Sequence, residues 1–204
     1  MAWYDITGTL ADWVMAGAAV YAAFRANGWF SQRLHSKGLD KAEEILLSID
    51  NCVTELETVL FKLDEIKYYL DAIHSNHIKA DYEVLKTYDQ TSKYLADKFN
   101  HINNIRHNTK LLYRWNIKTK KAEIFNNVYK YFISFYLTSS QSISLAHNSV
   151  YNICYMTREE FENSYVEYHQ LYEKTQVELV KVRKAYDVLT LHEFNDMFLL
   201  KKPH

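Results

Sequence analysis

The placement of glycine and proline constrains the fold of this 204-residue chain more than any other sequence feature. All four glycines lie at or before Gly38, and the single proline is Pro203. Residues 39–202 therefore lack the two residues that most often form tight turns, which disfavours sandwiches, barrels and short hairpins. The same absence excludes phosphate-binding and nucleophile-elbow glycine motifs from that stretch. We expect an all-α fold, a long-helix antiparallel bundle or coiled coil, with an N-terminal hydrophobic helix in front of it.

Residues 40–74 carry the clearest helical repeat in the chain. Apolar residues fill every a and d position of five heptads, a pattern typical of a bundle or coiled-coil helix: Ala42, Ile45, Ile49, Cys52, Leu56, Val59, Leu63, Ile66, Leu70 and Ile73. Asp40 is placed to cap the N-terminus of this helix. Thr157-Arg-Glu-Glu160 reads as a capping box that begins a second helix with an aromatic seam. We expect the two helices to pack as antiparallel partners.

The rest of the chain fits the same architecture. Residues 80–106 and 122–155 have helical patterns, and in the second we expect a break around residues 138–144. We divide the chain into an N-terminal apolar helix, residues 1–38, a helical bundle domain, residues 39–190, and a C-terminal tail, residues 191–204.

The N-terminal helix is a candidate membrane anchor. The apolar side chains of residues 6–26 contribute about −3 kcal/mol to membrane insertion, which a penalty of up to about +3 kcal/mol for Asp12 offsets. Trp3 and Trp29 bracket the segment and lie about 39 Å apart along a helix, close to the full thickness of a bilayer. Basic residues follow only on the C-terminal side, which places the body of the protein in the cytoplasm. We expect residues 6–26 to span the bacterial inner membrane; a buried helix of a cytoplasmic bundle is the alternative.

One face of this N-terminal helix is built from small residues. Asp12, Ala16, Ala19 and Ala23 share a helical stripe, at a spacing that lets two helices approach closely in lipid. The carboxylate would then face protein or water rather than lipid. The stripe predicts helix–helix packing in the membrane.

Basic residues are concentrated in residues 98–122, which contain seven Lys and Arg residues and no Asp or Glu. Residues 40–97 contain six basic and thirteen acidic residues, a net charge of −7. Four of the cations recur at every fourth residue, which predicts a stripe along one helical face. Partners for such a stripe are nucleic acid, anionic lipid headgroups or the acidic segment of the chain itself. The predicted polyanion-binding residues are Arg106, Lys110, Arg114, Lys118, Lys120 and Lys121.

No local motif identifies a catalytic site. Asp71, His74 and His77 are spaced by three and could contact a metal, but Glu-x-x-His pairs are absent and a polar helix end is the simpler interpretation. The serines at residues 139–144 lack a nucleophile context. We therefore name no catalytic residue, no cofactor and no metal ligand.

These features lead to three hypotheses about function. The first is a non-enzymatic, membrane-anchored helical bundle protein that forms homo-oligomers or binds a helical protein partner. Tyr, Asn, Ile, Lys and Phe are abundant and are encoded by AT-rich codons, a usage common in horizontally moved bacterial genes that include phage-defence genes. The specific version of the first hypothesis is therefore an oligomerising membrane effector of antiviral defence. The second is a soluble helical adaptor that binds nucleic acid or another polyanion through residues 106–121. The third is an enzyme with a dispersed site.

Overall fold

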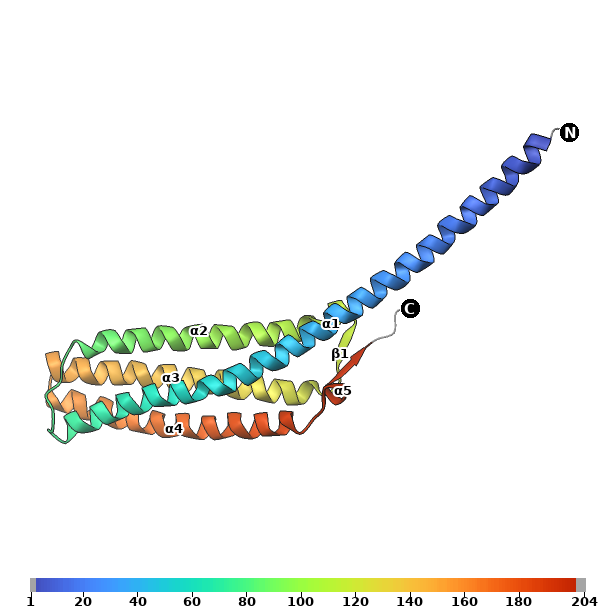
Figure 1. Ribbon diagram of the computed structural model, residues 1–204. Helices are drawn as coiled ribbons and strands as arrows, with labels where there is room; N and C mark the ends of the chain where they lie inside the picture. The colour runs from blue at the N-terminus through green and yellow to red at the C-terminus, as the bar shows by residue number, and fades with distance from the viewer. Residues whose placement is uncertain (1–2, 201–204) are drawn as a thin grey trace.

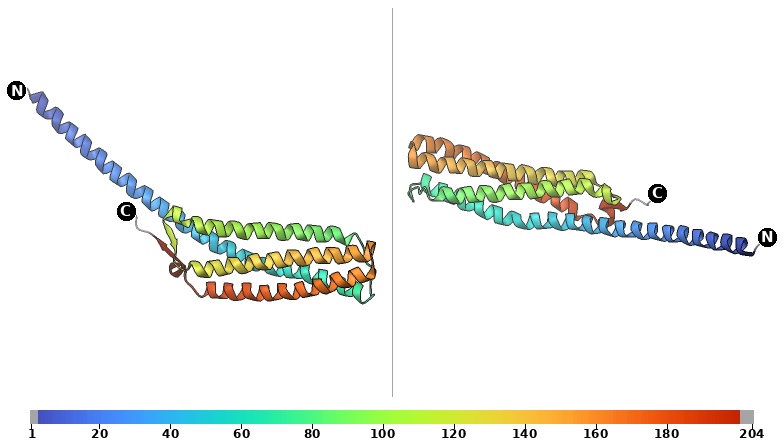
Figure 2. Two further views of the ribbon diagram at one scale, coloured as in Figure 1. Left: turned by 180° about the vertical axis from the view of Figure 1, so that it is seen from behind. Right: turned by 90° about the horizontal axis from the view of Figure 1, so that it is seen from above.

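Four long helices form most of the protein. The computed structural model describes the backbone of residues 3–200 and the side chains of residues 13–26, 28, 29, 33 and 36–199. The helices are α1 (Trp3–His74), α2 (Val84–Leu111), α3 (Ala122–Tyr155) and α4 (Arg158–Thr190). They lie side by side in a bundle, and the first part of α1 projects beyond it (Figures 1 and 2). The predicted all-helical bundle is confirmed.

Short elements close the bundle at the end where α1 leaves it. They are the 3₁₀ helix η1 (Leu112–Trp115), the strands β1 (Ile117–Thr119) and β2 (Phe198–Leu200), and the short helix α5 (Phe194–Met197). β1 pairs with β2 in antiparallel fashion, with Lys118 opposite Leu199. Nothing in the sequence pattern predicted this sheet. Met197 of α5 and Phe198 of β2 are buried, so the segment expected as a tail contributes to the core.

The heptad repeat of residues 40–74 is confirmed in full. All ten a and d side chains are buried, none more than 4% exposed. The predicted N-cap at Asp40 is wrong, because α1 runs unbroken through that residue. Neither Gly28 nor Gly38 stops the helix, since a glycine inside a helix lowers its stability by only about 1 kcal/mol.

The capping box of α4 is also confirmed. The Thr157 hydroxyl accepts from the Glu160 backbone N–H at 3.1 Å, and the Glu160 carboxylate accepts from the Thr157 N–H at 3.0 Å. Near the start of α4, the Tyr165 hydroxyl donates to Asp71 at the end of α1. Near its end, the Tyr186 hydroxyl donates to Asp50, earlier in α1. α1 and α4 are therefore antiparallel, as predicted, although α4 packs most extensively against α3.

The predicted break in residues 138–144 is wrong, since α3 is continuous from Ala122 to Tyr155. Ser139 and Ser142 are fully buried, and the Ser142 hydroxyl lies 3.3 Å from the Thr175 hydroxyl of α4. Small side chains in this stretch let α3 and α4 pack closely, so the polar run marks a helix–helix interface instead of a loop.

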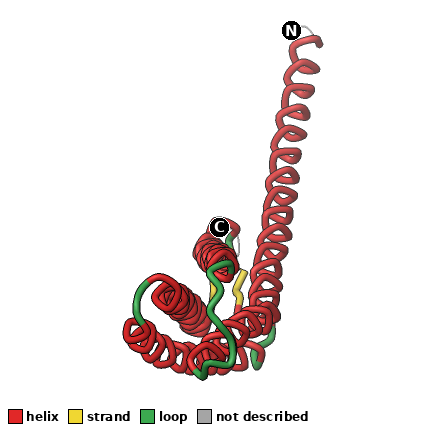
Figure 3. Tube along the Cα trace, turned by 90° about the vertical axis from the view of Figure 1, so that its left-hand side faces the viewer, coloured by secondary structure: helices red, strands yellow, loops and turns green. Residues whose placement is uncertain are grey.

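The projecting part of α1, residues 3–37, is called the arm below (Figure 3). Its side chains in residues 13–26 are all exposed, including Trp13 and Phe24 at 74% each. In the part of the chain that the structure describes, no helix has a stretch both long and apolar enough to cross a membrane. The expected transmembrane helix in residues 6–26 is therefore not supported.

The small-residue stripe of the arm is exposed at each of its described residues. Ala16, Ala19 and Ala23 are exposed, whereas the side chain of Asp12 lies outside the described residues. Packing of this stripe in a membrane stays a prediction.

Candidate functional site

A cleft of about 320 Å³ lies beside the last turns of α2, where η1 and β1 follow. Three of the predicted cations line it: Arg106 and Lys110 from α2 and Lys118 from β1. Tyr113 of η1 and the first two turns of α3 complete the lining. We call this site the basic cleft. It is lined by Arg106, Thr109, Lys110, Tyr113, Ile117, Lys118, Thr119, Ala122, Phe125, Asn126 and Tyr129.

The basic cleft has a rigid apolar floor. Ile117, Phe125 and Tyr129 are each 1% exposed. The Thr109 hydroxyl donates to the Ile105 carbonyl at 2.9 Å, so its single hydrogen is used, and the Tyr129 hydroxyl, 2.5 Å away, is the donor between the two. Burial raises the pKa of the Tyr129 phenol, which stays neutral. The floor therefore holds its shape without a charge of its own.

A left-handed turn brings Lys118 to the cleft. α2 ends at Leu111 and η1 at Trp115, and Asn116 follows with φ of 58°. Asn tolerates this conformation better than most residues, and its N–H closes onto the Tyr113 carbonyl at 3.1 Å. The chain reverses here, so Lys118 lies against the cleft rather than one turn further along a helix.

Among the described residues, the cations of the basic cleft have no carboxylate partner. Of the described residues that line the cleft, none is Asp or Glu. Among the ion pairs of the described side chains, none involves Arg106, Lys110 or Lys118. The cation of this segment that does meet the acidic segment is Lys98, whose Nζ lies 2.7 Å from Glu55. Three cations with no counter-charge leave the cleft suited to an anion.

The other predicted polyanion-binding residues point elsewhere. The expectation of one helical stripe is wrong, because the helix ends before Arg114, which is exposed and does not line the cleft. Lys120 donates to the Asn195 carbonyl at 2.7 Å, and Lys121 donates to Nδ1 of His192 at 3.0 Å. These two lysines hold the C-terminal segment against β1 and α3.

Sequence reasoning missed the part of the cleft that α3 contributes. Phe125, Asn126 and Tyr129 lie about a dozen residues or more beyond Tyr113 in the chain, and their spacing is that of an ordinary core-facing helix. No local signal sets them apart.

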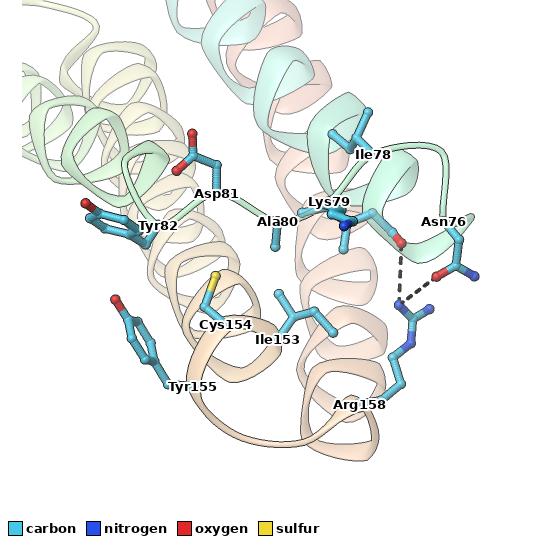
Figure 4. Close-up of a pocket in the computed structure, with 11 residues that line it drawn as sticks. Asn76, Ile78, Lys79, Ala80, Asp81, Tyr82, Ile153, Cys154, Tyr155 and Arg158 are labelled. Atoms are coloured by element: carbon cyan, nitrogen blue, oxygen red, sulfur yellow. Dashed lines mark hydrogen bonds between the residues drawn. The ribbon is translucent and has the colours of Figure 1, made fainter.

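A second and larger pocket, of about 560 Å³, lies at the opposite end of the bundle (Figure 4). The loop between α1 and α2 supplies Asp81, α3 supplies Cys154, and α4 supplies Arg158. Arg158 and Asp81 are engaged in hydrogen bonds and an ion pair with neighbouring helix ends and the loop. The Arg158 guanidinium donates to the His74 carbonyl at 2.8 Å and pairs with Glu162 at 2.6 Å, and the Asp81 carboxylate accepts from the Glu83 N–H at 2.9 Å. Lys79 and the free thiol of Cys154 also line this pocket, and burial raises the pKa of that thiol, which disfavours the reactive thiolate.

The residues considered as metal ligands form a hydrogen-bonded network instead. Asp71 accepts from Tyr165 at 2.9 Å, from His169 at 2.8 Å and from Lys67 at 2.6 Å. His74 stacks on Tyr165, with ring centroids 4.3 Å apart. Burial by itself raises the pKa of Asp71, but the donated hydrogen bonds outweigh it and hold the pKa below its usual range. Within the described residues, no group of three His, Cys, Asp or Glu could hold a metal ion.

Comparison with protein-family models, with curated proteins and with solved structures finds no match for this chain. Its function therefore has to be argued from the geometry of its own sites.

Proposed function

We propose that the protein is a non-enzymatic helical adaptor that binds single-stranded nucleic acid at the basic cleft. The proposal rests on the convergence of Arg106, Lys110 and Lys118 on one cleft, where the described lining residues include no carboxylate. Like charges brought together in this way repel one another, so a bound polyanion relieves a cost that the folded chain otherwise bears. Phosphate groups form strong, charge-assisted hydrogen bonds with Arg and Lys.

An aromatic side chain favours nucleic acid over other polyanions. The Tyr113 ring lines the basic cleft and is 61% exposed. Proteins that bind single strands combine a cationic groove with exposed aromatic rings on which bases stack. The Arg114 cation next to it in the chain could meet the following phosphate. One or two nucleotides at the cleft, with the strand continuing across η1, fit this arrangement.

Fluorescence polarisation with a labelled single-stranded oligonucleotide tests the proposal. Three phosphate contacts give a slope of about −2 for log affinity against log salt, so raising the salt fourfold should weaken binding about 20-fold. Reversing the three charges in Arg106→Glu, Lys110→Glu and Lys118→Glu together should abolish binding, and Tyr113→Ala should weaken it about tenfold or more.

The matched control variant reverses three positive charges that lie outside the basic cleft. Lys86, Lys93 and Lys174 are exposed, and none of them lines the basic cleft. Replacing these three with Glu alters the net charge equally and should leave most of the binding intact. If both triple variants lose binding to the same extent, the cleft is not the site and the proposal is wrong.

The hypothesis of an oligomerising membrane effector in bacterial antiviral defence stays a prediction. The exposed apolar side chains of the arm support an attachment of some kind, whereas the absence of a helix able to cross a membrane, within the described residues, does not support an anchor. Fractionation after an alkaline wash tests it, with the chain lacking residues 1–30 as the comparison. Recovery of the intact chain only in the soluble fraction would refute the anchor.

A further inference from the structure

The arm continues the seam that α1 buries inside the bundle. Counting heptads back from Ala42 and Ile45 places Val14, Tyr21 and Gly28 at a positions and Gly17, Phe24 and Gly38 at d positions. In the bundle every residue on this seam from Ala42 to Ile73 is buried. In the arm the same seam is exposed, with Val14, Tyr21 and Phe24 at 68%, 65% and 74%.

Three of the four glycines of the chain fall on this seam, and one of them shows what a glycine does there. Gly38 is buried, and a methyl group added to it would lie 2.8 Å from the carbonyl oxygen of Trp115. It therefore lets another part of the backbone approach α1 directly. Gly17 and Gly28 occupy equivalent seam positions, but an added methyl group would meet nothing within 4 Å. No contact with a described residue explains why these two positions lack a side chain.

We infer that the arm forms an antiparallel coiled coil with the arm of a second copy of this chain. Antiparallel packing brings a positions of one helix against d positions of the other. The register with its two-fold axis at residue 19 places Tyr21 opposite Gly17, Phe24 opposite Val14, and Gly28 opposite position 10, a leucine. Each of these three layers then joins a larger with a smaller residue, and both members of each pair recur by symmetry.

The length of the arm fits the same register. Position 3 falls opposite position 35, three residues before Gly38, where the backbone of Trp115 closes on α1. In this register residues 3–35 of the two arms overlap over about 50 Å and stop short of the place where Trp115 closes on α1. The parallel alternative stacks glycine on glycine and ring on ring, which leaves gaps beside crowded layers.

Charge favours the antiparallel orientation as well. Residues 1–24 contain two acidic residues and no Lys or Arg, and residues 25–37 contain three Lys or Arg residues and no acid. The antiparallel register lays the acidic half of each arm along the basic half of the other, whereas a parallel pair brings like charges together. This surface does not overlap the basic cleft, so the inference stands independently of nucleic-acid binding.

Sedimentation equilibrium of the full chain over a range of concentrations tests the inference. The wild-type chain should be a dimer, and Gly17→Leu should weaken dimerisation roughly 10- to 100-fold by filling the space that Tyr21 occupies. Ala19→Leu is the matched control, since Ala19 is exposed on the opposite face of the same helix. It adds the same bulk but should leave the dimer intact. Neither position contacts the bundle, so circular dichroism should show both variants folded.

Disulfide trapping then determines whether the two arms are parallel or antiparallel. In a Cys154→Ala background, chains with Val14→Cys mixed with chains with Phe24→Cys should cross-link to each other, while Val14→Cys alone should not. A wild-type chain that is a monomer at every concentration overturns the inference. So does Val14→Cys cross-linking to itself, or an Ala19→Leu effect as large as that of Gly17→Leu, which would instead assign the contact to the stripe of small residues.

Discussion

At the scale of single residues, the clearest constraint is a close approach that only glycine permits. Gly38 is buried where α1 passes the end of η1, and an added methyl group would lie 2.8 Å from the Trp115 carbonyl oxygen and 3.0 Å from the Ile117 side chain. The carbonyl oxygen belongs to the backbone and cannot rotate away. This contact sets the place where α1 leaves the bundle.

Replacing Gly38 with Ala should therefore destabilise the protein. The clash in a packed site lowers the free energy of unfolding by about 1–3 kcal/mol. The better helix propensity of Ala offsets up to about 1 kcal/mol of that loss. Urea denaturation measures the net loss. An unchanged or raised midpoint would show that α1 does not pass this close to Trp115.

The carboxylate of Asp71 gives a prediction about pH. Its folded pKa lies below the unfolded value of about 3.9, so the ionised form stabilises the fold in full above about pH 5. That stabilisation is lost as the pH falls through the folded pKa. Asp71→Asn should lower the free energy of unfolding by about 1 kcal/mol at pH 7, and by progressively less toward pH 3. A difference from wild type that is the same at both pH values would contradict this account.

At the scale of elements, two residues with good capping side chains behave differently because of what precedes them. Thr157 follows the end of α3 in extended backbone, with φ of −117° and ψ of 157°, and so begins a helix. Asp40 follows a helical segment and becomes an interior residue of α1. The side chain alone does not decide whether a residue caps a helix.

Removing the two side chains separates these cases. Thr157→Ala should lower the free energy of unfolding by about 1 kcal/mol, because it leaves backbone N–H groups of α4 without an acceptor. Asp40→Ala, at an exposed position inside a helix, should change it by less than about 0.5 kcal/mol. Thermal unfolding of the two variants checks both values. Equal losses would mean that a helix does begin at residue 40 in solution.

At the scale of the whole molecule, the chain combines a bundle with an arm that receives no support from it. The bundle part of α1 contacts α2, α3 and α4 along a buried seam. The arm has no such contacts among its described side chains, and isolated helices gain little stability from propensity alone. We expect the two parts of one continuous helix to differ sharply in local stability.

Hydrogen exchange should reveal this difference. In a dilute solution of the chain, amides of residues 42–73 should be protected at least about 100-fold more than those of residues 13–24. If the arm pairs with a second copy, protection in residues 13–24 should rise with concentration while that of residues 42–73 stays constant. Uniform protection of α1 under dilute conditions would contradict the division.

The sequence by itself determined the helices and much of their packing. The heptads of residues 40–74 and the capping box at Thr157 were sufficient because each depends on residues within a few turns of one another. The basic residues of the cleft were also predictable as a group. Their grouping into a site was not, because Arg106 and Lys118 meet only through the reversal at Asn116 and a wall supplied by α3.

Only the tertiary structure decided which of these surfaces remain free. It separates Lys120 and Lys121, which bind the C-terminal segment, from the three cations that meet no counter-charge among the described residues. It also shows one seam of α1 buried in the bundle and exposed in the arm. The physical reason is that helical periodicity is a local property of the chain, whereas burial and charge compensation depend on which distant segments pack against each helix.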